Sequence, residues 1–132
     1  MKKSFLLTVH GTTTATTSGT LSLYNRWFEN AVTAIQIEKG MTIKLWSLEI
    51  SGAIGDILIN TTEDNTEGSP TFVERLRYSQ GQTFPALIID KNNRPIPILT
   101  SSDGNQAVNI GWSQSVAATM YVNATFEVTW ED

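Results

Sequence analysis

The segment that most constrains the fold is residues 120–130, close to the end of the sequence. It is MYVNATFEVTW, in which every even position is apolar and the odd positions hold Tyr, Asn, Thr, Glu and Thr. Successive side chains of a strand point to opposite faces, so this alternation predicts a strand with one face in a core. At ~3.3 Å per residue it spans roughly 35 Å, well beyond a typical strand of about five or six residues. A strand of this length is normally central, and we expect it to lie between earlier strands of its sheet.

The polar residues are mostly small and neutral. Charged residues make up 17% of the chain, whereas Thr alone occurs 18 times. Such side chains suit β-structure and loops better than helices. The net charge is −4 and no stripe of Lys or Arg is present. A nucleic-acid partner is therefore not expected, because phosphate binding needs such a stripe.

A chain of 132 residues is expected to form one domain, residues 1–132. The apolar run at residues 5–7 is shorter than the ~7 to 15 residues of a secretion signal, and we take it as part of the mature protein. No apolar run approaches the ~20 residues of a membrane span. Residues 11–20, GTTTATTSGT, predict a flexible Thr-rich loop, or an arm that orders against a neighbouring subunit.

Three further segments predict strands with distinct features. Phe5, Leu7 and Val9 alternate in a first strand over residues 4–10. In residues 41–50 the apolar phase changes at Trp46-Ser47, which predicts a β-bulge. Two prolines remove two backbone donors from residues 95–99, so this strand should lie at an edge or beside a bulge.

Two other segments have less regular patterns. Ser69 and Pro70 resemble the cap and first position of a helix, and three apolar residues after them share a helical face. We therefore predict one short helix over residues 70–79. Residues 86–90, ALIID, predict a buried strand.

Together these segments give eight to ten strands and at most one or two short helices. The predicted fold class is all-β, a two-sheet antiparallel β-sandwich of jelly-roll type. An immunoglobulin-like sandwich is disfavoured because the chain exceeds ~100 residues and has no cysteine for the hallmark disulfide.

No catalytic, metal or cofactor site is expected. His10 is the sole histidine and no G-x-S-x-G motif occurs, which disfavours a hydrolase triad. Four carboxylates at strand ends or turns would be candidates for glycoside hydrolysis, but no pair stands out. They are Glu49, Asp56, Asp90 and Asp103. Residues 61–69 are acidic without the EF-hand spacing, so we expect a solvated loop in preference to a calcium site.

The four tryptophans divide into two pairs. Trp112 and Trp130 are in phase with apolar neighbours, which predicts core positions. Trp27 and Trp46 are out of phase or ambiguous, and they are our candidates for an exposed contact surface.

From about residue 31 to residue 130, the layout resembles the single jelly-roll structural proteins of viruses, particularly bacteriophage capsid, decoration or fibre-head subunits. The segments that carry the resemblance are KGMTIKLWSLEISGA, FPALIIDKNNRPIPIL and MYVNATFEVTW. The resemblance implies a virion protein without enzymatic activity that assembles with itself and with other virion proteins.

On this hypothesis, the candidate interface or ligand contacts are Trp27, Trp46, Pro95 and Pro97. The alternative is a secreted carbohydrate-binding module or lectin-like β-sandwich. It would bind a glycan through an exposed tryptophan and the loop at residues 61–69.

Overall fold

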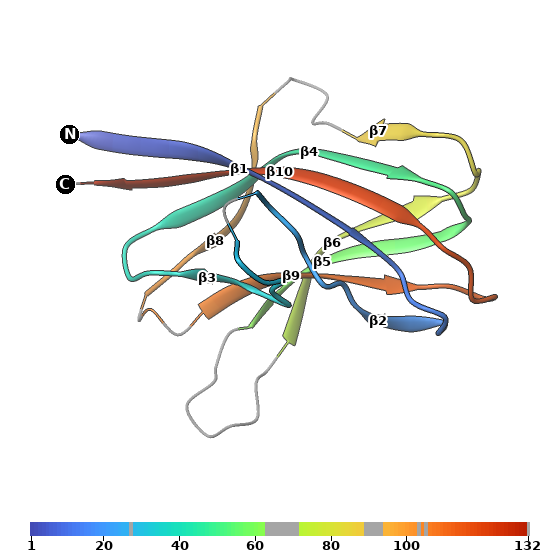
Figure 1. The fold of residues 1–132 in the computed structure, drawn as a ribbon. Helices are drawn as coiled ribbons and strands as arrows, with labels where there is room; N and C mark the ends of the chain where they lie inside the picture. Colours follow the sequence, from blue (N-terminus) through green and yellow to red (C-terminus); the bar gives the residue numbers. More distant parts are fainter. Residues whose placement is uncertain (27, 63–71, 89–93, 103, 105, 132) are drawn as a thin grey trace.

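In a computed structural model of the chain, ten strands in the described residues form two antiparallel sheets that face each other (Figure 1). The structure describes residues 1–26, 28–62, 72–88, 94–102, 104 and 106–131. Among them no helix has the length and apolar character that crossing a membrane requires.

Sheet A contains the predicted last strand in its middle. It consists of β1 (Lys2–Thr12), β10 (Tyr121–Glu131), β4 (Thr42–Ser51), β7 (Ala86–Ile88) and β8 (Ile96–Thr100). Their order is β1-β10-β4-β7, and β8 pairs with β4 beyond the stretch that pairs with β7. The prediction that residues 120–130 lie between earlier strands is confirmed.

Sheet B is built around a strand that is buried on both faces. It consists of β2 (Ser18–Thr20), β9 (Gln106–Ser113), β5 (Gly55–Thr62), β6 (Phe72–Gln80) and β3 (Ile35–Ile37). Their order is β2-β9-β5-β6, and β3 also pairs with β9. All residues of β9 before its last are buried.

The two sheets together have the strand order of a jelly roll. β2 and β3 pair with successive stretches of β9, and β7 and β8 pair with successive stretches of β4, so each couple occupies one strand position. Counted in this way, the eight positions follow the order 1-8-3-6 in sheet A and 2-7-4-5 in sheet B. The predicted two-sheet sandwich of jelly-roll type is confirmed.

The core lies between the sheets and draws on the alternation of the strands. In β10 the even positions from 122 to 128 are buried, Trp130 is partly buried, and Phe126 is fully enclosed. On β1, Leu7 and Val9 face the same core. Because one side of each strand is apolar, closing the two sheets removes these side chains from water together.

The bulge predicted at Trp46-Ser47 is confirmed. Thr125 of β10 pairs with Ser47 of β4, but the next residue, Phe126, pairs with Leu45. Trp46 therefore has no opposite residue, and the apolar phase of β4 changes at this point. Leu45 and Leu48 can both point into the core as a result.

The proline-containing strand also lies as expected. β8 occupies an outer position of sheet A, and its register with β4 shifts between Ile43 and Lys44, with Pro97 opposite Lys44. An edge position beside an irregularity tolerates the missing proline donors.

The helix predicted over residues 70–79 is wrong for the described part, because Phe72–Gln80 form strand β6. Leu76 and Tyr78 are two residues apart and pack against the core, which is strand periodicity. β5 pairs with β6 from one end to the other. The short apolar pattern is compatible with a helical period and with a strand period, and this pairing decides for the strand.

The prediction of a buried strand at residues 86–90 is wrong in its burial. β7 pairs with β4 over only three residues, and Leu87 points outward with an exposed side chain. Asp90 lies outside the described residues. Because β7 lies at the edge of the sheet, one face of this apolar segment is left uncovered.

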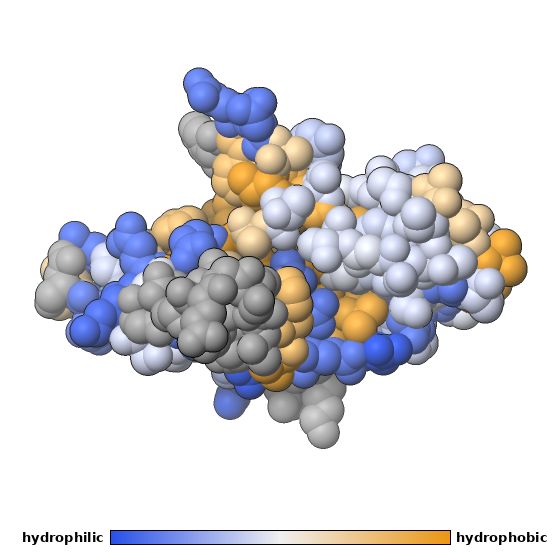
Figure 2. All heavy atoms as spheres, turned by 90° about the horizontal axis from the view of Figure 1, so that it is seen from below, coloured by the Kyte–Doolittle hydropathy of each residue, from blue (hydrophilic) through white to orange (hydrophobic). Residues whose placement is uncertain are grey.

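The surface matches the composition. Figure 2 shows one face on which pale, weakly polar residues gather in the right half, strongly hydrophilic residues lie to the left and along the lower rim, and hydrophobic atoms are exposed at the right-hand end. Weakly polar residues thus form part of the surface, in keeping with the low share of charged residues in the sequence.

Candidate assembly surface at the edge of sheet A

β1 pairs with β10 along its entire length and forms an outer edge of sheet A. The N–H of His10 donates to the carbonyl of Tyr24 at 3.0 Å, and the N–H of Tyr24 donates back to the carbonyl of His10 at 2.8 Å. The even residues of β1 therefore direct their backbone groups away from β10. The carbonyl of Thr8 accepts a hydrogen bond from the Asn25 side chain. One end of this edge is thus covered by residues 24–25.

The other end of the edge is open. Among the described residues, no backbone partner lies against the outward groups of Lys2, Ser4 and Leu6. The side chains here are partly apolar: Leu6 is 63% exposed and Phe5 is 46% exposed. An unpaired strand edge with exposed apolar side chains is a template for pairing with another strand.

A mainly apolar groove of about 490 Å³ runs beside this open edge. It lies between β1 and the segment that leads into β3, where the two sheets do not close over one another. Its lining consists of Phe5, Leu6, Leu7, Phe28, Val32, Ala34, Ile35 and Gln36. An extended segment added to β1 would direct alternate side chains towards this groove.

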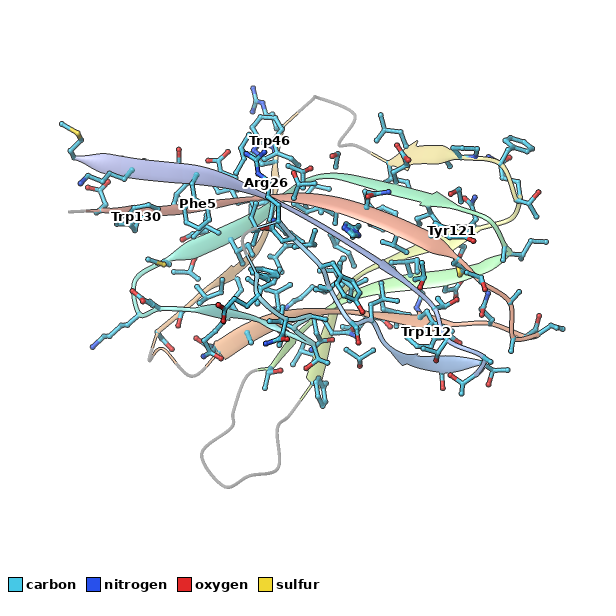
Figure 3. The ribbon with its side chains drawn as sticks, viewed as in Figure 1. Phe5, Arg26, Trp46, Trp112, Tyr121 and Trp130 are labelled. Carbon is cyan, nitrogen blue, oxygen red and sulfur yellow. The ribbon has the colours of Figure 1, made fainter. Side chains whose placement is uncertain are left out.

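Phe5 is held in place by the final strand. Its ring packs edge-on against Trp130 of β10, with the ring centroids 5.7 Å apart (Figure 3). The indole of Trp130 is itself partly buried against the core. Because the two rings fix each other, the edge is presented by a paired strand and not by a loose terminus.

The candidate contact residue Trp46 lies on the outer face of the same sheet. The bulge turns its side chain outward, where it is 36% exposed, and its Nε1–H donates to Glu127 Oε2 at 2.6 Å. Glu127 is the direct cross-strand neighbour of Leu6. The hydrogen-bonded pair of Trp46 and Glu127 therefore lies beside the strand that carries the open edge.

The other candidate contacts are more dispersed. Pro97 is exposed on β8, while Pro95, just before β8, is half-buried. Trp27 lies outside the described residues. Phe5 and Leu6 were not among the predicted contacts, although Leu6 is apolar and out of phase with Phe5, Leu7 and Val9. The out-of-phase position of Leu6 was the signal in the sequence that could have indicated an exposed apolar side chain.

The carboxylates considered for catalysis are not brought together. Glu49 lies on the outer face of sheet A, whereas Asp56 belongs to β5 in sheet B and bonds to Arg77. Asp90 and Asp103 lie outside the described residues, as does most of the loop at residues 61–69. Within the described ranges, no three metal-ligating side chains converge.

Arg77 instead forms a surface network on β5 and β6. Its Nη1 donates to Asp56 Oδ2 at 2.9 Å and its Nη2 donates to Glu74 Oε1 at 2.6 Å. The hydrogen bond from Arg77 lowers the pKa of the Glu74 carboxyl below its ordinary value. Any stability linked to Glu74 is therefore present above its unfolded pKa and is lost as pH falls through the lowered folded pKa.

We expect Arg77→Ala to raise the pKa of Glu74 towards its ordinary value, because the donor that favours the carboxylate is removed. The measurement is a carboxyl NMR titration of both proteins. An unchanged Glu74 titration in the variant would show that the hydrogen bond does not persist in solution.

No protein-family model matches the sequence, and no curated protein matches it. Among solved structures, the chain is similar to one described as the cyanophage Pam1 capsid asymmetric unit, with 13% identity and a TM-score of 0.42. The match covers 97% of this chain and 86% of that chain. The jelly-roll assignment stands on this chain's own strand order.

Proposed function

We propose that the protein is a structural subunit of a virus particle, in a capsid, decoration or spike, and that it acts by self-assembly and not by catalysis. Its expected location is the virion, and its expected partners are further copies of itself and other virion proteins. Two features support the class: the jelly-roll strand order, and the sequence layout shared with single jelly-roll viral structural proteins.

The open edge of β1 is the observation that carries the proposal. A monomer that remains separate usually protects its edge strands with charge, proline or a covering segment. Here the stretch from Lys2 to Leu6 does carry two lysines at its start. It also combines outward backbone groups of Lys2, Ser4 and Leu6 that have no described backbone partner, two exposed apolar side chains and an adjoining apolar groove. A second copy supplies the same pattern of donors and acceptors, so two edges complement each other about a two-fold axis.

The register of such a pair follows from what blocks the edge. Pairing centred on Phe5 or Leu6 would need the outward groups of Thr8 or His10, which already bond to Asn25 and Tyr24. Pairing centred on Lys3 would place two lysines directly opposite each other, which is unfavourable. An axis at Ser4 avoids both problems, and places Lys2 opposite the partner's Leu6.

This register also suits the charges on the outer face. Leu6 lies beside Glu127 of its own subunit, so the partner's Lys2 would approach that carboxylate across Leu6. On the inner face, the partner's Lys3 lies opposite Phe5. Its alkyl stem can cover the apolar groove while its ammonium group stays in water.

We expect Leu6→Lys to dissociate the assembly while the subunit stays folded. In each half of the proposed pair the new lysine faces the partner's Lys2 and replaces a leucine that pairing would cover. Over the two halves this costs roughly 3 kcal/mol of association free energy. That corresponds to about a 100-fold rise in dissociation constant. Within one subunit the lysine lies next to Glu127, so folding should not suffer. Light scattering coupled to size-exclusion chromatography measures the change.

The matched control is Thr125→Lys, which adds the same charge to the same face but on the central strand β10. It should leave the oligomeric state unchanged. A wild-type protein that stays monomeric at high concentration would contradict the proposed function. A stable oligomer that tolerates Leu6→Lys would preserve self-assembly but assign it to another surface.

A further inference from the structure

We infer that a hollow over the β1–β10 ladder is a binding site for a neutral sugar, such as a terminal hexose of a glycan. The hollow measures about 450 Å³, within the range of ~300 to 1,000 Å³ usual for small-molecule sites. Its floor is the ladder at Gly11 and Val122, which pair directly. It lies beyond the covered end of β1, away from the open edge at Lys2–Leu6, so the inference does not depend on assembly.

Two tyrosines line the hollow. The ring of Tyr24 stacks on His10, with centroids 5.8 Å apart and planes 19° apart, and its backbone is tied to His10 by two hydrogen bonds. Tyr121 starts β10 (Figure 3), and a Cβ placed on Gly52 would come within 2.7 Å of its ring. Both tyrosines are nevertheless about half exposed, at 51% and 52%.

These rings are therefore held in position and remain accessible. A pyranose presents one face of C–H groups, which packs by dispersion against an aromatic face. Because the rings are already fixed, little side-chain freedom would be lost when a sugar binds. The close packing on Gly52 also explains the use of glycine there, where φ is +97° and a side chain would strike Tyr121.

Besides the tyrosines and Thr12, two polar side chains line the hollow. His10 and Asn123 lie opposite each other on β1 and β10. Within the part of the chain that the structure describes, neither side chain makes a hydrogen bond. The Asn123 amide offers two donors and an acceptor, and a neutral imidazole offers one donor and one acceptor. This set matches adjacent hydroxyl groups, each of which both donates and accepts.

The charge pattern selects a neutral ligand. Apart from His10, the lining contains no acidic residue, lysine or arginine. Outside the lining, Glu49 of β4 is the cross-strand neighbour of Asn123, while Arg26 borders the neighbouring hollow that shares His10. These opposite charges on two sides favour neither an anion nor a cation, whereas an uncharged polyol satisfies the polar groups without a counter-charge.

The test is titration of methyl glycosides of the common hexoses into the isotopically labelled protein, followed by NMR. At least one glycoside should shift the amide resonances of residues 10–12, 24 and 121–123. Tyr121→Ala and Asn123→Ala should each raise the dissociation constant of that glycoside about tenfold, which is the effect of removing one favourable contact. The control is Trp46→Ala, an exposed aromatic on the same sheet face outside the hollow, which should bind as the wild type does.

Three results would overturn the inference. The first is that no glycoside in the panel perturbs these resonances. The second is that the perturbations cluster elsewhere, for example around Trp46. The third is that Tyr121→Ala and Asn123→Ala fold and bind as tightly as the wild type does. Leu6→Lys should leave sugar binding intact, so failure of the assembly surface and failure of this site can be told apart.

Discussion

Phe126→Asp is expected to prevent folding. Phe126 is fully buried at the middle of β10, between β1 and β4, and no described cation is available there to pair with a carboxylate. Burying an unpaired charge costs several kcal/mol, and losing the phenyl ring adds about 3 to 5 kcal/mol. A domain of this size is stable by only about 5 to 15 kcal/mol. Circular dichroism and the dispersion of the NMR spectrum would report the loss.

Its matched control is Thr125→Asp, one position earlier. Thr125 points to the outer face, where its hydroxyl lies 3.1 Å from that of Thr8 in an exposed pair. The new carboxylate stays hydrated, so stability should change by less than about 1 kcal/mol unless that face is an interface. If Phe126→Asp folded cooperatively, the assignment of the even positions of β10 to the core would be wrong.

Trp112→Ala is expected to cost about 3 to 5 kcal/mol of unfolding free energy. Trp112 is only 4% exposed, and its Nε1–H donates to the carbonyl of Thr16 at 3.2 Å. A Cβ on Gly19 would lie 2.6 Å from the indole, so β2 is packed tightly onto this ring. Removing the indole leaves a cavity beside Gly19 and removes the hydrogen bond to Thr16 in the Thr-rich segment. Urea denaturation would measure the difference.

Trp46→Ala is the comparison. Trp46 is partly exposed at the bulge, and its main polar contact is the hydrogen bond to Glu127. Losing that contact should cost about 1 kcal/mol or less, since both partners can bond to water. Equal losses from the two substitutions would contradict the contrast in burial between these tryptophans.

Several features of the fold could be predicted because they depend on local periodicity. The alternation in residues 120–130 identified the buried face of β10, the phase change at Trp46-Ser47 located the bulge, and the prolines placed β8 at an edge. In each case the signal is the geometry of a strand, in which side chains alternate and a missing donor is tolerated only where no partner needs it.

Other features could not be predicted from local pattern. The segment 72–80 satisfied a helical and a strand period over its short apolar run, and only pairing with β5 decided between them. Leu87 and Leu6 are apolar yet exposed, because β7 and β1 lie at outer positions of sheet A. Whether a strand is central or at an edge depends on partners that are distant in sequence.

The candidate sites depend on the same distant pairing. In the sequence, Tyr24 lies about a hundred positions before Tyr121 and Asn123, and no local pattern connects them. The β1–β10 ladder and the Tyr24–His10 bridge bring the three residues to one hollow. The sequence by itself determined the all-β class, the buried face of β10 and the bulge in β4, since these follow from a two-residue period. Only the tertiary structure decided which edge of sheet A remains open, because that depends on which strands find backbone partners.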